Sequence, residues 1–258
     1  MQTREDKVLS QIDYTNSSLI GVEIGALNSP IITRTMGNSR YIDHVSTDVL
    51  KTKYSDDSKI DSSKEIVDVD YVWGEQTLAE LTKQEAPFDY VIACHVIEHV
   101  PDIVGWLQEI HSILKLGGVL SLAIPDKRNC FDYNRNVTKL GDILESYLTN
   151  SRKPTPKQVF DSHSQSVTLR NEQLWVDRII KKSELVHTTS MIAAWDRTKV
   201  VFDSNAYDDV HCWVFTPRSF FSLLEGLAEL SLLRFEPIQF HPTAGHEFFV
   251  TLKAVDDV

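Results

Sequence analysis

The chain has 258 residues and a net charge of −11; 42% of its residues are hydrophobic and 24% are charged. This length suits one large α/β domain, or a standard domain that carries an insertion. The negative charge disfavours nucleic acid as a partner, because a basic face supplies most of the affinity for phosphates. The apolar runs, such as residues 119–124, are strand-sized and too short to cross a membrane.

The N-terminus and the cysteines indicate a compartment. Residues 1–7 contain no apolar stretch of the kind found in secretory signals. Cys94, Cys130 and Cys212 lie far apart, which argues against a disulfide framework and against a cysteine zinc site. We therefore expect a cytoplasmic protein with no membrane span and no bound metal. The sequence does not indicate an oligomeric state.

The first half of the chain alternates between strand-like and helix-like segments. A helix is expected to begin at Pro30, and another to run from Pro101 to Gly117 with one apolar stripe. Such alternation is typical of a parallel sheet that helices cover on both faces. The expected strands are residues 19–24, 41–43, 66–70, 88–94 and 119–124.

The alternation stops after Pro125 and resumes at Thr216. We expect a single domain over residues 1–258, with a core of residues 15–125 and 216–254 and an insertion or lid of residues 126–215. An amphipathic helix is expected over residues 137–148 of the insertion. Trp175, Trp195 and Trp213 are expected to pack in the core rather than to stack on a sugar.

A helix should follow Thr216, which has the side chain of an N-cap, with Pro217 in its first turn. Two more strands are expected at residues 232–240 and 246–253. The link between them is short, so the pair should be antiparallel.

Four segments form a recognisable set: residues 22–25 (VEIG), Asp43, residues 88–92 (FDYVI), and residues 96–102 (VIEHVPD) followed by residues 116–118 (LGG). On these segments the chain resembles the class I S-adenosylmethionine-dependent methyltransferases along almost its whole length. Residues 94–102 are also similar to methyltransferases encoded beside glycosyltransferases for surface polysaccharides. The resemblance implies a Rossmann-like, seven-stranded, mostly parallel sheet with an antiparallel C-terminal hairpin, and S-adenosylmethionine as cofactor.

The resemblance implies roles for residues at the carboxyl ends of the strands, where such folds bind ligands. Glu23 would pair with the cofactor's ammonium, and Gly25 would let the backbone turn beneath the cofactor. Asp43, twenty residues after Glu23, would accept both ribose hydroxyls. Asp70 would accept from the adenine amino group. Other expected contacts are Ala26, Asn28, Tyr71, Cys94 and His95.

These carboxylates also have plainer interpretations. Glu23 could be partnered within its own loop, and Asp43 and Asp70 could be solvated strand ends. Leu27 and Ser29 stand where the family commonly has further glycines. Leu27 argues against a nicotinamide-dependent reductase, because a pyrophosphate needs a closer approach of the backbone.

Methyl transfer to a hydroxyl needs alignment and a base. His95, Glu98 and His99 follow strand four and are the candidate catalytic residues. The string from His95 to His99 also matches the H-x-x-E-H motif of zinc peptidases. A zinc peptidase is disfavoured, since the histidines follow a strand and Pro101 interrupts any helix through them. A divalent metal at Glu98 and His99, or hydrogen bonds that only hold the loop, are the open alternatives.

Asp126 and Arg128, beyond strand five, are the candidate contacts to the acceptor. Arg128 could bind an acidic sugar or a phosphate, or the two residues could pair with each other. We expect O-methylation of a saccharide or another small polar acceptor, with a catalytically weak scaffold in polysaccharide assembly as the alternative. Further histidines that could act as the base are His163, His187 and His211.

Overall fold

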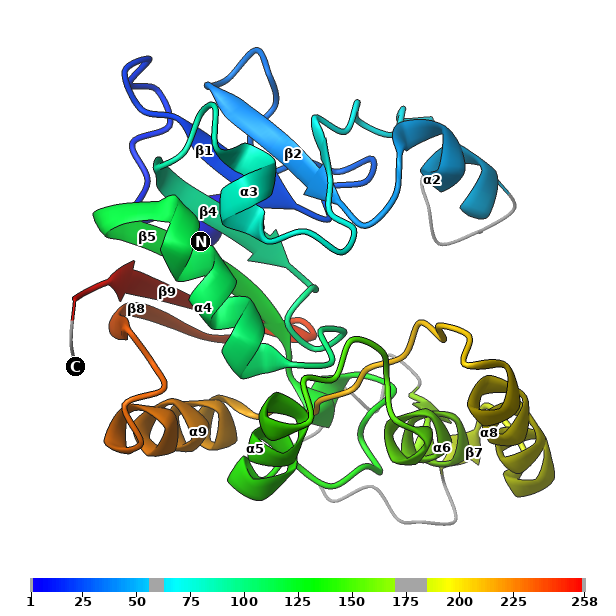
Figure 1. Ribbon diagram of the computed structural model, residues 1–258. Coiled ribbons are helices and arrows are strands. Elements are labelled where there is room, and N and C mark those ends of the chain that lie inside the picture. Colours follow the sequence, from blue (N-terminus) through cyan, green and yellow to red (C-terminus); the bar gives the residue numbers. More distant parts are fainter. Residues whose placement is uncertain (1, 56–62, 170–184, 257–258) are drawn as a thin grey trace.

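The computed structural model describes residues 2–55, 63–169 and 185–256, and its centre is a seven-stranded sheet (Figure 1). The strand order is β3-β2-β1-β4-β5-β9-β8. The first five strands are parallel, and β9 runs antiparallel to both β5 and β8. The sheet and its C-terminal hairpin are therefore as predicted. The strands are β1 (Gly21–Ile24), β2 (Ser39–Asp43), β3 (Tyr71–Val72), β4 (Phe88–Cys94), β5 (Leu114–Pro125), β8 (Phe235–Ala244) and β9 (Glu247–Ala254).

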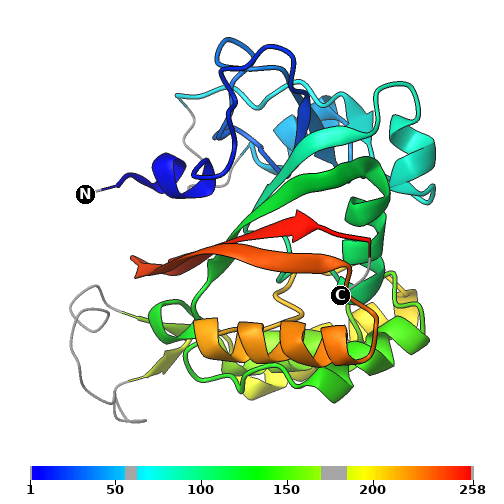
Figure 2. The ribbon, with the colours of Figure 1, turned by 90° about the vertical axis from the view of Figure 1, so that its left-hand side faces the viewer.

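Helices cover the two faces of the sheet unequally. On one face, α4 (Ile103–Ile113) buries Ile103, Leu107 and Ile110, beside α3 (Leu78–Thr82), α5 (Leu140–Leu148) and α9 (Pro217–Glu229). On the other face the short α1 (Arg4–Val8) packs against β5 and β9. Figure 2 shows α1 in dark blue on the opposite side of the sheet from α4. The helix α2 (Thr47–Lys53) follows β2.

The helix predicted after the first strand is wrong. Residues 25–38 form turns and bends instead. The Glu23 carboxylate accepts hydrogen bonds from the backbone N–H groups of Ile31 and Ile32, and Tyr41 donates its hydroxyl to the Ile32 carbonyl. Both isoleucines are buried against the second face of the sheet. These long-range contacts hold a non-helical backbone where local sequence favours a helix.

The predicted third strand is wrong as well, because β3 covers only Tyr71–Val72. Asp70 precedes this strand and does not end it. Its backbone N–H donates to the Tyr41 carbonyl at 2.9 Å, but its carboxylate, and not a backbone carbonyl, accepts from the Tyr41 N–H at 2.8 Å and also from Arg34. Similarly, α4 ends at Ile113 rather than at Gly117, and β5 begins at the next residue.

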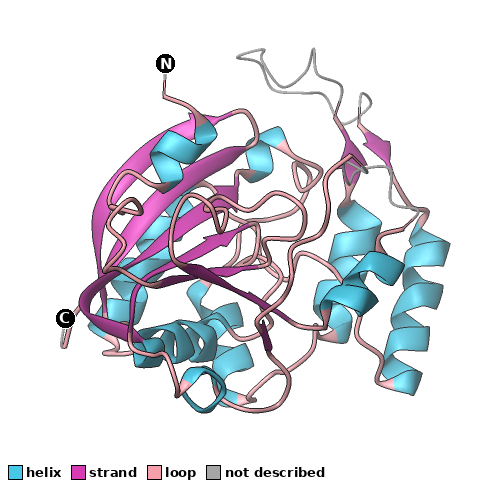
Figure 3. Cartoon of the chain, turned by 90° about the horizontal axis from the view of Figure 1, so that it is seen from above, coloured by secondary structure: helices cyan, strands magenta, loops and turns pink. Residues whose placement is uncertain are grey.

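The insertion leaves and rejoins the core at one point, since Asp126 and Phe215 pair in an isolated parallel bridge. Between them lie α5 and two helices that pack on each other, α6 (Pro156–Gln165) and α8 (Met191–Ser204). A short turn of 3-10 helix covers Lys127–Asn129, and β6 (Val167–Thr168) pairs with β7 (Val186–His187). Figure 3 shows this small sheet and the insertion helices to one side of the main sheet.

The tryptophans of the insertion differ. Trp213 is buried and donates its indole N–H to the Val100 carbonyl at 2.6 Å, as expected for a packed residue. Trp195 is 54% exposed, so the expectation of core packing is wrong for it. Trp175 lies outside the described residues. Within the described part of the chain, no helix is both long enough and apolar enough to cross a bilayer.

Candidate cofactor and catalytic site

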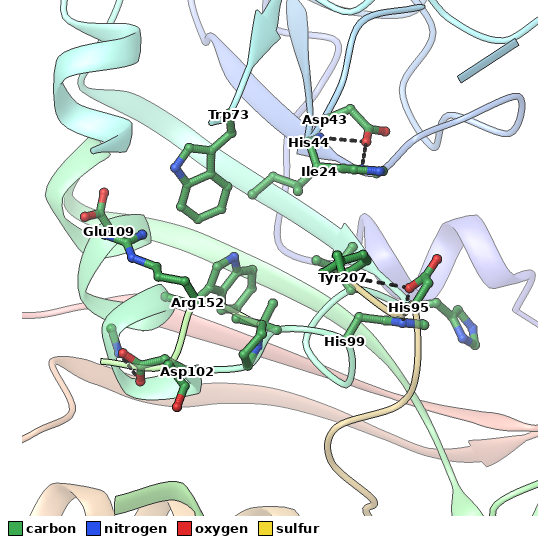
Figure 4. A pocket seen from close by; sticks show the side chains of 18 of the residues that line it. Ile24, Asp43, His44, Trp73, His95, His99, Asp102, Glu109, Arg152 and Tyr207 are labelled. Atoms are coloured by element: carbon green, nitrogen blue, oxygen red, sulfur yellow. Dashed lines mark hydrogen bonds and ion pairs between the residues drawn. The ribbon is translucent and has the colours of Figure 1, made fainter. Parts of the chain in front are cut away.

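A cavity of about 510 Å³ opens at the carboxyl ends of the parallel strands (Figure 4). Its volume lies in the range of about 300–1,000 Å³ that is usual for small-molecule sites. Strand ends, helix α4 and the insertion all contribute to its wall. The residues that line it include Ile24, Gly25, Leu27, Asp43, His44, Trp73, His95, Val96, His99, Asp102, Trp106, Glu109, Asn150, Ser151, Arg152, Tyr207 and Asp209.

The turn after β1 keeps a glycine-like conformation at two positions. Gly25 has φ of +70°, and a Cβ atom there would meet Val96 Cγ2 at 3.1 Å. Leu27 has φ of +47°, in the left-handed region that glycine adopts more readily. Both residues line the cavity. The turn therefore has the shape of a glycine-rich loop, although leucine occupies one of its left-handed positions.

Asp43 ends β2 and lines the cavity, as its position in the sequence predicted. It is 7% exposed, and its Oδ1 accepts from the His44 N–H at 2.7 Å and lies 2.6 Å from His44 Nδ1. An ionised carboxylate can accept about four hydrogen bonds. Asp43 can therefore accept hydroxyls of a ligand while its contacts to His44 persist.

Glu23 lies outside the cavity wall, in contrast to Asp43. Its side chain is 2% exposed and accepts from Ile31 N–H at 2.8 Å and Ile32 N–H at 3.2 Å. Burial raises the pKa of Glu23 to about 7, although these hydrogen bonds oppose the shift. The contacts are those of a carboxylate partnered within its own loop.

Five other predicted cofactor contacts, Ala26, Asn28, Asp70, Tyr71 and Cys94, do not line the cavity. Asp70 pairs with Arg34, and the Tyr71 hydroxyl donates to Glu85. Burial raises the pKa of the Cys94 thiol to about 12, and Ala26 and Asn28 are buried. These residues support the loop and strands beneath the site, while their neighbours Leu27, His44 and Trp73 face the cavity.

Trp106 is a lining residue that the sequence did not indicate as functional. It is 3% exposed, and within the described residues its indole nitrogen has no hydrogen-bond partner. A buried donor without an acceptor is costly, by about 1–3 kcal/mol. The sequence offers no sign of a role for Trp106, because a tryptophan among the apolar residues of a packed helix is normally a core residue.

His95 is held as a cation. Its Nε2 lies 2.7 Å from Glu247 Oε2, and its Nδ1 lies 3.5 Å from Glu98 Oε1. Burial lowers the pKa of His95, but the two carboxylates outweigh this and raise the pKa to about 9. Arg4 also pairs with Glu247, at 2.8 Å. His95 is therefore protonated near neutral pH, which disfavours the expected role of general base.

We expect His95→Gln to lower the free energy of unfolding by about 1–3 kcal/mol at pH 6 and by little at pH 10. The folded pKa of about 9 exceeds the ordinary 6.5, so this stabilisation is complete below pH 6.5 and is lost as the pH rises through 9. The same stabilisation is also lost as the pH falls from 4.5 to about 2, because the Glu247 carboxylate, whose pKa is lowered to about 2, becomes protonated. Urea unfolding at pH 6 and pH 10 measures the difference. An equal loss at both values would contradict the ion pair.

Glu98, His99 and His211 form a second cluster, which borders the cavity through His99. Glu98 Oε1 lies 4.0 Å from His99 Nε2 and 3.9 Å from His211 Nε2. Burial would raise the pKa of Glu98, but the surrounding histidines hold it below its ordinary value. Of the three histidines singled out in the insertion, His163 instead pairs with Asp208 and His187 with the Ser164 carbonyl.

Asp126 and Arg128 pair with each other, outside the cavity wall. Asp126 is fully buried and accepts from the Arg128 guanidinium at 2.5 Å and from the Thr243 hydroxyl at 2.6 Å. Their proximity beyond β5 was predicted, but the pairing occupies the groups that were expected to bind the acceptor. The insertion reaches the cavity through Arg152, Tyr207 and Asp209 instead.

The strand order and a cavity at the carboxyl ends of the parallel strands define a Rossmann-like fold. A family model described as a methyltransferase domain matches residues 6–227. The chain belongs to this family and is an enzyme that uses S-adenosylmethionine as its methyl donor. No curated protein matches the chain.

The solved structures to which the chain is similar include methyltransferases of low sequence identity. A CurJ carbon methyltransferase has 10% identity and a TM-score of 0.42; 96% of this chain aligns, and it spans 51% of the length of that chain. An S-adenosylmethionine-dependent methyltransferase from Methanosarcina mazei has 13% identity, a TM-score of 0.45, and coverages of 94% and 95%. One from Aquifex aeolicus has 9% identity, a TM-score of 0.44, and coverages of 98% and 90%.

Proposed function

We propose that the protein transfers a methyl group from S-adenosylmethionine to a hydroxyl of a small polar acceptor, with a saccharide as the favoured class. The observation that carries this proposal is the cavity. It extends from the strand ends at Gly25 and Asp43 to polar groups of the insertion at Arg152, Tyr207 and Asp209. A methyl donor at the strand ends would thus meet an acceptor held by the insertion.

The cofactor's adenosine would occupy the end of the cavity near Trp73. Figure 4 places Trp73, Glu109 and Arg152 at one end, and His95, His99 and Tyr207 at the other. Asp43 would accept the ribose hydroxyls, and the unpartnered indole N–H of Trp106 would donate to an adenine ring nitrogen.

The methionine part would lie toward Gly25 and His95. The Gly25 turn lets the backbone approach closely, since it carries no side chain. Protonated His95 would offset the negative charges of Glu98 and Glu247 at this end of the cavity, where the methionine carboxylate would lie. This role fits its ion pair with Glu247 better than that of a base.

The lining residues of the insertion fit an acceptor that carries several hydroxyls. Asp209, which lies beside His99 at the end of the cavity opposite Arg152, can accept hydrogen bonds from these hydroxyls. Tyr207 offers an aromatic ring against which the apolar face of a sugar can pack. Saccharide methylation would place the protein in polysaccharide biosynthesis.

The test is methyl transfer to a panel of sugars, nucleotide sugars, amines and carbon acids. Incubation with S-adenosylmethionine should release S-adenosylhomocysteine only with hydroxylated acceptors, and mass spectrometry should find one methyl ether per product. Transfer confined to nitrogen or carbon would contradict the proposal.

A catalytically weak scaffold in polysaccharide assembly is the second candidate. Leu27 favours it, because a leucine side chain occupies a turn position where the family commonly has glycine. The scaffold hypothesis predicts a normally folded protein that does not bind S-adenosylhomocysteine. Cofactor binding by the intact chain therefore separates the two candidates.

A further inference from the structure

We infer that Glu98, His99 and His211 bind one divalent first-row transition metal ion at the edge of the cavity. The ligand atoms of these three side chains all lie within 4.8 Å of one another. Binding of the ion does not depend on the proposed function. Its use, to hold and activate an acceptor hydroxyl, rests on that function.

The distances suit an ion after a small closure. Oxygen and nitrogen ligands lie about 2.0–2.2 Å from such a metal, so two ligands at a tetrahedral angle are about 3.4 Å apart. The carboxylate oxygen of Glu98 lies 3.9 Å and 4.0 Å from the two imidazole nitrogens. Movements of roughly half an ångström would close the site.

The Glu98 carboxylate is the strongest sign of a missing cation. It is 1% exposed, and among the described residues neither of its oxygens accepts a hydrogen bond; its nearest charged neighbour is the protonated His95, whose Nδ1 lies 3.5 Å from Oε1. An ionised carboxylate in such a place costs several kcal/mol unless it is paired or coordinates a metal. An ion between Glu98 and the two histidines would satisfy it.

Carboxylates behind the two histidines orient them. Asp132 Oδ2 lies 2.5 Å from His211 Nδ1, and Arg135 holds Asp132 in turn at 2.7 Å. Asp209 Oδ1 lies 3.0 Å from His99 Nδ1, at the distance of an ion pair but without the geometry of a hydrogen bond. Both rings therefore present Nε2 to Glu98, in the arrangement by which outer carboxylates fix metal-binding histidines.

A nearby cluster of similar composition differs in how closely its carboxylate is paired with cationic side chains. His95, His246 and Glu247 also lie within reach of a common point. There, however, Glu247 is already paired with His95 at 2.7 Å and with Arg4 at 2.8 Å. Glu247 is thus held by two short ion pairs, whereas the shortest contact of Glu98 with a charged group, that to His95, is 3.5 Å long.

The ligand set indicates the ion and its use. Two imidazoles and one carboxylate suit Zn²⁺, Co²⁺ or Mn²⁺ better than Mg²⁺ or Ca²⁺, which prefer oxygen ligands. Three protein ligands leave a position open, and His99 borders the cavity, so an acceptor hydroxyl can fill it.

The ion would lower the pKa of that hydroxyl. Its proton would leave to solvent while the oxygen forms a bond to the methyl carbon. The bond from carbon to sulfur breaks, its electron pair stays on sulfur, and neutral S-adenosylhomocysteine results.

The test is Co²⁺ binding by the untagged full chain after removal of metals with EDTA. We expect saturation at one ion per chain, with visible d–d absorption. Glu98→Gln and His211→Gln should weaken binding more than 100-fold, and Asp132→Asn by about 10–100-fold. His163→Gln, which removes a histidine from another His–Asp pair of the insertion, should bind like wild type.

Circular dichroism checks that each variant is folded. If Glu98→Gln and His211→Gln do not fold, Asp132→Asn is the variant that tests the inference. Failure of the wild type to bind Co²⁺, or equal binding by a folded Glu98→Gln or Asp132→Asn, would overturn the inference. Calorimetry with S-adenosylhomocysteine on the metal-free protein distinguishes the two proposals. Cofactor binding without Co²⁺ binding removes only the metal site, and the reverse result removes the proposed function.

Discussion

Replacement of Glu23 by alanine should lower the free energy of unfolding by about 3–5 kcal/mol. The substitution removes the acceptor of two buried backbone N–H groups, those of Ile31 and Ile32, and each unsatisfied donor costs about 1–3 kcal/mol. It also leaves a cavity beneath the loop of residues 25–38. Urea unfolding monitored by tryptophan fluorescence measures the loss.

Glu23→Gln is the matched control, because the amide oxygen can still accept from the loop. Glu23 has a raised pKa of about 7, so the folded state binds an extra proton between pH 4.5 and 7 and the wild type loses stability as the pH rises through this window. Glu23→Gln should lack this dependence. A Glu23→Ala protein as stable as wild type, but with weaker cofactor binding, would instead make Glu23 a ligand of the cofactor.

Asp43→Asn should weaken binding of S-adenosylhomocysteine by about 10–100-fold without loss of stability. The loss corresponds to one or two hydrogen bonds from ribose hydroxyls to a charged acceptor, each worth about 1.5–3 kcal/mol at most. The asparagine oxygen can still accept from the His44 N–H, so the strand end should keep its structure. Isothermal titration calorimetry measures the affinity.

Asp70→Asn is the control for this prediction, since Asp70 was also expected to bind the cofactor but lies outside the cavity wall. The side-chain oxygen of an asparagine at position 70 can still accept from the Tyr41 N–H. We expect its affinity to equal that of wild type. Equal weakening in the two variants would show that the effect is general and not due to the ribose.

Strand ends could be located from sequence because their signals are local. The alternation of strand-like and helix-like segments predicted β1, β2, β4 and β5. Because these strands end at one edge of the sheet, it also predicted that Gly25, Asp43, His95 and His99 lie close together. The loop of residues 25–38 could not be predicted in this way. Its shape depends on hydrogen bonds from the loop backbone to Glu23 of β1 and from Tyr41 of β2 to the loop. Likewise, the sequence does not reveal that the Asp70 side chain, and not a backbone carbonyl, accepts the Tyr41 N–H just before β3.

The residues of the insertion that meet the site were beyond prediction for a different reason. Arg152, Asp209 and His211 reach the cavity or the Glu98 cluster only through the way residues 126–169 and 185–215 fold back on the core. Their neighbours in the sequence carry no periodic signal of that contact. His211 had been singled out as a histidine, but its partnership with Glu98 and His99 emerges only in three dimensions.

The most direct test of the account is a calorimetric titration of the intact protein with S-adenosylhomocysteine. The cavity at Gly25, Asp43 and Trp106 predicts saturable binding of one molecule per chain, lost or strongly weakened in Gly25→Val, where a branched side chain would meet Val96. Absence of binding by folded wild-type protein, or unchanged binding by folded Gly25→Val, would contradict the assignment of this cavity to the cofactor.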